Sequence, residues 1–216
     1  MNASIPFASW EPIINLGTNA VIGGEVLCAH PHPRGSYAWR MWYTHIGLVA
    51  TRAGLSGLCT INVDTHQLLD KTIVRALLGA FAEAPAGIEW YIEWTERGSH
   101  RHIEAAACIL TSLRDRRPDI GVVIDDVGAG QDGLRRIALT QPNIIKIDRY
   151  ILARARDYRM ARSIIEHVAA IGRDIGAKTV CEGLETKSDH GLVHDLGVDW
   201  GQGYLWPASH LMRHPI

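Results

Sequence analysis

Short apolar runs alternate along the chain with longer segments whose apolar residues recur with a helical period. In residues 160–175, for example, Ile164, Ile165, Val168 and Ile171 fall on one helical face. The strand-like runs are residues 11–16, 21–27, 57–62, 88–94, 120–125, 144–147, 177–181 and 201–205, and helix-like segments include 102–113, 133–139, 160–175 and 187–196. Such alternation predicts an α/β fold with a parallel sheet, and about eight strands favour a closed barrel.

The segment 29–54 interrupts this alternation, because its helical pattern is weak at best. It carries His-Pro-His-Pro at 30–33 and the aromatic residues Trp39, Trp42 and Tyr43. The His-Pro repeat is expected to form a rigid extended turn. We expect the aromatic residues to pack in the core, although a lid or a partner surface is the alternative.

Composition narrows the class of protein. The 22 Lys and Arg residues balance 23 Asp and Glu residues, and this formal net charge of -1 argues against a partner that is a nucleic-acid polymer. The four scattered cysteines indicate reduced thiols rather than a disulfide framework. No apolar run approaches the roughly 18 residues of a membrane span, and no signal peptide is evident. A cytoplasmic protein is therefore expected.

Charged and amide side chains stand where the predicted strands end. A buried strand that ends in a charge is costly unless the charge reaches solvent, a partner or a metal. Because the carboxyl ends of parallel barrel strands share one face, we expect these side chains to converge there. They are Glu25, Asn62, Glu93, Asp125 with Asp126, Lys146 with Asp148, and Glu182 with Glu185.

The five acids Glu25, Glu93, Asp125, Asp126 and Glu182 would repel one another without cations. Oxygen ligands and one amide suit Mg²⁺ or Mn²⁺ better than zinc, and a two-ion site suits displacement at phosphorus. Taken singly, each acid is more often a helix N-cap or a surface residue, but their common register favours the metal site. The hypothesis requires that the carboxylates meet and that no lysine or arginine already neutralises them.

These residues also carry a resemblance to the EAL domain family, the bacterial cyclic-di-GMP phosphodiesterases. The motifs follow the family's order from about residue 10 to 207; they include Glu25-Val-Leu27 where the family has Glu-Ala-Leu, Asn62-Val-Asp64, Ile124-Asp-Asp126, Ile145-Lys-Ile-Asp148, Cys181-Glu-Gly183 and Gly201-Gln-Gly203. The resemblance implies a single EAL-like domain over residues 1–216. Its fold would be a modified TIM-like (β/α)8 barrel with one antiparallel strand, about one helix shorter than the family after the second strand.

The resemblance also assigns roles, and the implied reaction is metal-dependent hydrolysis of cyclic-di-GMP to linear pGpG. Glu25, Asn62, Glu93 and Asp125 would bind one ion, and Asp125 would bridge to a second ion with Asp126. Lys146 and Glu182 would orient and deprotonate the attacking water. Gln202 would complete the catalytic set beside them. The supporting and loop residues would be Glu96, Asp148, Glu185, Gly128 and Gly130, with Glu96 tethering the loop 126–130.

Some positions depart from the family pattern. The family has an arginine that contacts a substrate phosphate where this chain has Ala29, and a ligand-binding glutamine where it has Glu11. A lost charge-assisted phosphate contact costs about 1.5–3 kcal/mol, so a weak enzyme is expected. The alternative is a catalytically degenerate EAL domain that acts as a cyclic-di-GMP receptor or a protein-interaction module. A further possibility is an output domain that requires a homodimer, paired through residues 131–142.

Overall fold

Strands and helices alternate along most of the chain, as the hydrophobic pattern predicts. The computed structural model describes residues 8–28, 33–84, 86–95, 100–130, 132–207 and 209–210. The strands are β1 (Ala8–Asn15), β2 (Val21–Cys28), β3 (Gly57–Val63), β4 (Ile88–Trp94), β5 (Gly121–Val127), β6 (Ile144–Ile147), β7 (Lys178–Cys181), β8 (Trp200–Gly201) and β9 (Ser209–His210). The helices are α1 (Gly35–Ala53), α2 (Thr65–Leu69), α3 (Lys71–Glu83), α4 (Ile103–Arg116) after the short η1 (His100–His102), α5 (Gly133–Thr140), α6 (Arg149–Ala155), α7 (Arg159–Ile175) and α8 (Lys187–Asp195).

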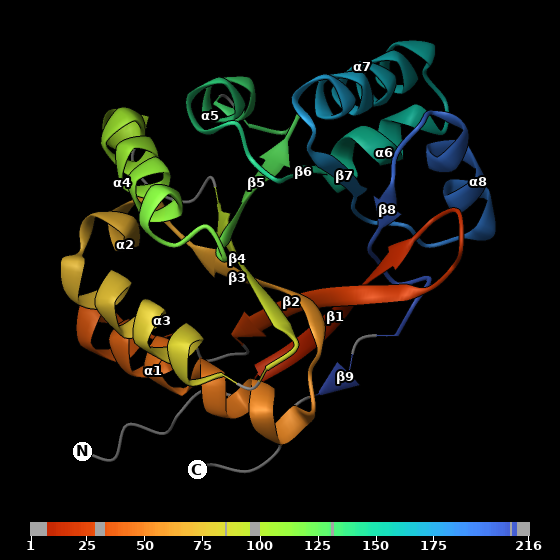
Figure 1. Ribbon diagram of the computed structural model, residues 1–216. Coiled ribbons are helices and arrows are strands. Elements are labelled where there is room, and N and C mark those ends of the chain that lie inside the picture. The colour runs from red at the N-terminus through yellow and green to blue at the C-terminus, as the bar shows by residue number, and fades with distance from the viewer. Residues whose placement is uncertain are drawn as a thin grey trace.

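The strands form a closed barrel with helices around its outside (Figure 1). Strands β2 to β8 follow one another in chain order around the barrel, each parallel to the next. Strand β1 pairs antiparallel with β2 on one side and with β8 on the other, which closes the ring. The predicted TIM-like barrel with one antiparallel strand is therefore confirmed.

The interior of the barrel has an apolar layer beneath a charged one. Alternate residues of a strand point inward, so positions two apart share the interior. Two positions beyond Val123 and Ile144, the same faces of β5 and β6 carry Asp125 and Lys146. The apolar layer excludes water from below, so the charges above it reach solvent only through the mouth. Its buried residues are Ile13, Leu58, Val123, Ile144 and Val180.

The prediction of an irregular segment at 29–54 is wrong for residues 35–53, which form the 19-residue helix α1. Trp42, Tyr43, Ile46 and Val49 form its buried face, so the expected core packing is confirmed for Trp42 and Tyr43. A Cβ at Gly47 would lie 2.7 Å from the Ala80 carbonyl, and this glycine lets α1 pack closely on α3. Ala29 and most of the His-Pro repeat lie outside the described residues. None of the helices in the described ranges is long and apolar enough to cross a membrane.

The strand predicted at 201–205 is also wrong beyond Gly201, where β8 ends. The chain instead turns toward the loop after β7. The Leu184 amide donates to the Gln202 carbonyl at 3.1 Å, and the Leu205 amide donates to the Leu184 carbonyl at 2.8 Å. Gly203, with φ 150°, approaches Leu184 so closely that a Cβ would collide with its backbone. This turn holds Gln202 at the mouth of the barrel.

Candidate active site

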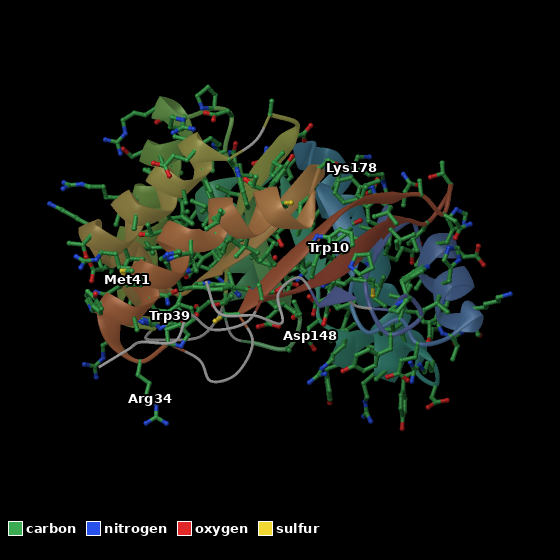
Figure 2. The ribbon with its side chains drawn as sticks, turned by 90° about the horizontal axis from the view of Figure 1, so that it is seen from below. Trp10, Arg34, Trp39, Met41, Asp148 and Lys178 are labelled. Carbon is green, nitrogen blue, oxygen red and sulfur yellow. The ribbon has the colours of Figure 1, made fainter. Side chains whose placement is uncertain are left out.

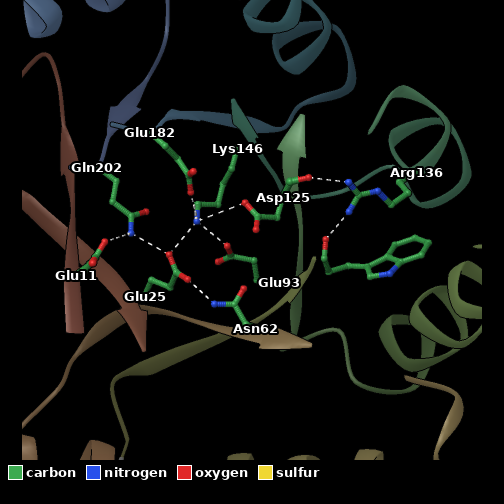
Figure 3. A network of polar contacts seen from close by, with 10 residues as sticks. Glu11, Glu25, Asn62, Glu93, Asp125, Arg136, Lys146, Glu182 and Gln202 are labelled. Carbon is green, nitrogen blue, oxygen red and sulfur yellow. Dashed lines mark hydrogen bonds and ion pairs between the residues drawn. The ribbon is translucent and has the colours of Figure 1, made fainter. Parts of the chain in front are cut away.

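A buried lysine lies at the centre of the charged layer, and four carboxylates surround it (Figure 3). Lys146 on β6 is 1% exposed. Its Nζ lies 2.5 Å from Glu182 Oε1, 2.6 Å from Glu93 Oε1, 2.9 Å from Glu25 Oε2 and 3.7 Å from Asp125 Oδ1. The acids at the strand ends therefore converge, as predicted. They come from strands β2, β4 and β5 and from the residue that follows β7.

Two amides and a second glutamate surround Glu25. Asn62 Nδ2 donates to Glu25 Oε1, and Gln202 Nε2 donates to Glu25 Oε2 at 2.9 Å. The same Gln202 nitrogen lies 3.2 Å from Glu11 Oε2, because Glu11 and Glu25 are paired across β1 and β2. Since the nitrogen of Asn62 is occupied by Glu25, its amide oxygen is the atom available to a cation.

A single lysine balances only part of the charge of the acidic cluster. Burial would lower the pKa of Lys146, but the carboxylates around it raise the pKa well above its ordinary value. Burial and the neighbouring acids raise the pKa of Glu93 and Asp125, and burial raises the pKa of Glu182 to about 8. One ammonium can balance only one of the four carboxylates, and the raised pKa values of the other acids reflect the cost of keeping them ionised without a further cation. The acids therefore converge as the hypothesis requires, but Lys146 already pairs with Glu25, Glu93 and Glu182, so the condition on neutralising cations is met only in part.

The donor set suits divalent cations. Carboxylate oxygens of Glu25, Glu93 and Glu182 lie within 4.8 Å of one another, and so do those of Asp125, Asp126 and Glu182. Within the described ranges, Glu93 Oε2 is buried and has no hydrogen-bond donor. A buried carboxylate oxygen without a donor is costly unless a cation binds it. Oxygen ligands of this kind fit Mg²⁺ or Mn²⁺.

Asp126 and Asp148 lie together beside the cluster. Asp126 has a positive φ of 56°, which turns its side chain away from the alternation of β5. Burial, with Asp125 and Asp148 nearby, raises the pKa of Asp126 to about 6. The Tyr150 amide donates to Asp148 at 2.6 Å, so Asp148 caps α6. Gly128, in the middle of the predicted loop 126–130, has a φ of 106°. Glu96, its predicted tether, lies outside the described residues.

Arg136, which the sequence analysis missed, supports Asp125 from behind. It is 2% exposed, and its guanidinium donates to the Trp94 carbonyl at 2.6 Å and to the Asp125 carbonyl at 2.8 Å. The ends of β4 and β5 are thereby held together (Figure 3). Arg136 follows Arg135 in a polar stretch, and no sequence pattern separates the buried arginine from the exposed one.

Asp189 on α8, also missed, fixes the loop that carries Glu182 and Glu185. It accepts from Arg156 Nε at 2.8 Å, the Thr186 amide at 2.9 Å and the Glu185 amide at 3.1 Å. Glu185 itself is 55% exposed and lies 3.7 Å from Arg156. Its predicted supporting place is thus at the edge of the site, outside the acidic cluster.

We expect Asp189→Asn to lower the free energy of unfolding by about 2 kcal/mol at pH 7, because a hydrogen-bonded charge is lost. Burial would raise the pKa of Asp189, but Arg156 and the loop amides lower it below its ordinary value of 3.8. The stabilisation is therefore present above pH 3.8 and disappears as the pH falls through the lower folded value. Urea titrations at pH 7 and at acidic pH measure the difference.

The control is Asp195→Asn, at an 85% exposed side chain on the same helix. That change should alter the free energy of unfolding by less than about 0.5 kcal/mol. Equal stabilities of Asp189→Asn and wild type at pH 7 would contradict the role given to Asp189.

A cavity of about 740 Å³ opens over the acidic cluster. Cys28 at the end of β2 and Trp39 of α1 line one part of it, and Arg149 of α6 lines another. In Figure 2, Trp39 and Asp148 lie on the same face of the molecule. A space of this size accommodates a small-molecule ligand.

Comparison with known sequences shows a related family. The model described as "EAL domain" matches residues 46–208. The cyclic di-GMP phosphodiesterase RocR of Pseudomonas aeruginosa is 29% identical over 96% of this chain, which covers 59% of RocR. The probable cyclic di-GMP phosphodiesterase PdeB of Escherichia coli is 25% identical over 93% of this chain, which covers 42% of PdeB. The chain thus spans about half the length of these relatives.

Solved structures share the fold. The EAL domain of Mycobacterium smegmatis DcpA has a TM-score of 0.78 at 24% identity, covering 98% of this chain and 94% of that one. A Klebsiella pneumoniae BlrP1 structure, described as a manganese and cy-diGMP complex, also has a TM-score of 0.78, at 20% identity. It covers 98% of this chain and 58% of that one.

Proposed function

The chain belongs to the EAL domain family, and we propose that it hydrolyses cyclic-di-GMP to linear pGpG with the help of two divalent ions, Mg²⁺ or Mn²⁺. The observation that carries the proposal is the convergence of Glu25, Glu93, Asp125 and Glu182 around a single lysine. The name of the relative RocR supports the substrate. We treat residues 1–216 as one EAL domain.

The proposed ligands lie on the four neighbouring strands β2, β3, β4 and β5. Glu25, Glu93, Asp125 and the amide oxygen of Asn62 would hold one ion, and Asp125 and Asp126 would hold the other. When bound, such ions polarise the phosphoryl group and lower the pKa of bound water. Gln202 keeps the Glu25 carboxylate oriented by donating to it at 2.9 Å.

Glu182 is the proposed proton acceptor. It is the member of the Lys146 cluster that is most open to the cavity, at 21% exposure, against 0% for Glu93 and 8% for Glu25. In its deprotonated form, which cations bound by the neighbouring acids would favour, Glu182 takes the proton of the attacking water as the new P–O bond forms. The bond from phosphorus to the ribose oxygen breaks, and solvent water protonates the leaving oxygen. Lys146 holds the Glu182 carboxylate in place at 2.5 Å and stabilises negative charge on the reacting phosphate.

The test is product analysis with the purified chain, cyclic-di-GMP and either ion. We expect pGpG by chromatography, loss of product with EDTA, and loss of most activity in Glu25→Ala. Glu104→Ala is the control, because Glu104 is an exposed residue of α4 outside the cavity lining. Absence of hydrolysis at micromolar substrate with both ions would refute the enzymatic proposal.

The alternative function is a receptor or interaction module without catalysis, and Glu11 is the observation that favours it. Its carboxylate lines the cavity beside Gln202, where it disfavours a phosphate. Calorimetry separates the two forms of this alternative. A receptor binds cyclic-di-GMP without turnover, whereas an interaction module gives no heat with the dinucleotide.

We also propose a homodimer that pairs through residues 131–142. Within this stretch Leu134 of α5 is 62% exposed and Leu139 is 38% exposed, so an apolar surface is available. Leu134→Asp should shift the chain to monomer in ultracentrifugation, whereas Val21→Asp, at a 59% exposed residue of β2, should not. A wild-type monomer with full activity would rule out the dimer requirement.

A further inference from the structure

The cavity above the acidic cluster is strongly negative. Eight carboxylate residues line it, but among the described residues of the lining only Lys146 and Arg149 are cationic. Lys146 is already surrounded by four carboxylates. The carboxylate residues are Glu11, Glu25, Asp64, Asp125, Asp126, Asp148, Glu182 and Glu185.

A cyclic dinucleotide brings two phosphodiester groups into this cavity. The acidic cluster and its ions act on one of them, so the other needs a separate cation if it is not to face carboxylates alone. The family's phosphate-binding arginine is absent here, because position 29 is Ala29. The preceding residue, Cys28, lines the same cavity as Arg149, so the end of β2 and the start of α6 border one space.

Arg149 is held at the border of this cavity by its backbone. It is the first residue of α6 and follows Asp148, whose carboxylate caps the helix. Gly183, with φ 74°, follows Glu182; a Cβ there would lie 2.5 Å from Arg149 Cβ. The loop of the proposed proton acceptor therefore closes directly against Arg149. The Arg149 side chain is exposed, and no ion pair is found for it with any residue of the described ranges.

We propose that Arg149 binds the second, non-scissile phosphate of the dinucleotide and so supplies the contact that Ala29 lacks. The inference rests on the proposed function. A guanidinium can donate two parallel N–H groups to phosphate oxygens, which a lysine cannot do. Arg149 is thereby a substrate-binding residue that makes the site selective for a dinucleotide over a diester with a single phosphate.

The experiment compares two substrates. Cyclic-di-GMP has both phosphates, whereas bis(p-nitrophenyl) phosphate has only the one that is cleaved. Arg149→Ala should raise the KM for cyclic-di-GMP about ten- to a hundred-fold, with the KM for the small diester within about two-fold of wild type. Arg149→Lys should give an intermediate KM. The control is Arg154→Ala, on the same helix but over the Tyr158 ring and outside the cavity lining.

A KM for cyclic-di-GMP within two-fold of wild type in Arg149→Ala would overturn the inference. An equal rise for both substrates would also overturn it, because that result indicates a structural role. If the wild type cleaves neither substrate, the proposed function fails. Calorimetry with cyclic-di-GMP and Mg²⁺ then tests whether Arg149 contributes to binding of the dinucleotide. A ten-fold weaker Kd in Arg149→Ala then supports the contact, and an unchanged Kd, or no binding by wild type, contradicts it.

Discussion

Glu182→Gln is expected to lower kcat for cyclic-di-GMP by about 10²- to 10⁴-fold, the range of a general base, while leaving the fold intact. The amide is nearly the same size as the carboxylate but cannot accept the proton of the attacking water. Glu182 Oε1 lies 2.5 Å from Lys146 Nζ, and the side chain is 21% exposed at the mouth. Steady-state kinetics with saturating Mn²⁺ measures the change.

The matched control is Glu185→Gln, three residues along the same loop. Glu185 also lines the cavity, but its side chain is 55% exposed and contacts Arg156 instead of the lysine. Its change should leave kcat within about ten-fold of wild type, since it removes no proton acceptor. A kcat for Glu182→Gln that matches the Glu185→Gln value would show that another group takes the proton.

Lys146→Met should lower the free energy of unfolding by about 3–5 kcal/mol in EDTA, because it leaves buried carboxylates without their cation. The side chain is 1% exposed and contacts acids from four segments. Added Mn²⁺ should restore part of the loss, because the ions supply the missing positive charge. Chemical denaturation with EDTA and with Mn²⁺ measures both effects, and kcat should fall together with stability.

Lys178→Met is the control for this prediction. Lys178 pairs with Asp199 at 2.7 Å, but its side chain is 55% exposed, so the change should cost less than about 1 kcal/mol. Equal stability of Lys146→Met and wild type in EDTA would mean that the carboxylates do not depend on the lysine. The cluster would then need another source of charge balance.

The convergence of the acids could be predicted because two simple rules act together. Inward residues of a strand are two apart, and parallel strands of a barrel end at one face. The sequence therefore predicts that a charged residue at the end of an apolar run lies at the mouth of the barrel. Glu93 on β4, Asp125 on β5 and Lys146 on β6 are examples. The antiparallel direction of β1 could be predicted only from the family resemblance, because a hydrophobic pattern does not indicate in which direction a strand runs.

Other features depend on contacts that no local pattern records. Helix α1 has a weak sequence signal because aromatic and β-branched residues have low helix propensity, yet burial of Tyr43 and Ile46 in the core outweighs it. Arg136 is buried because the carbonyls of Trp94 and Asp125, remote in sequence, accept its hydrogen bonds. Asp189 combines a local capping box with Thr186 and an ion pair with Arg156, 33 positions away, and only the capping box has a local sequence signature. The turn at Gly203 depends on the backbone of Leu184, which is remote in sequence.

The account depends on divalent cations binding between the acids, and Mn²⁺ calorimetry of the purified chain tests this most directly. We predict two Mn²⁺ ions per wild-type chain. The heat should be lost in Asp125→Ala, which removes the ligand proposed for both ions, and should be unchanged in Glu104→Ala. No Mn²⁺ binding by the wild type at millimolar metal, or the same binding in Asp125→Ala, would contradict the account.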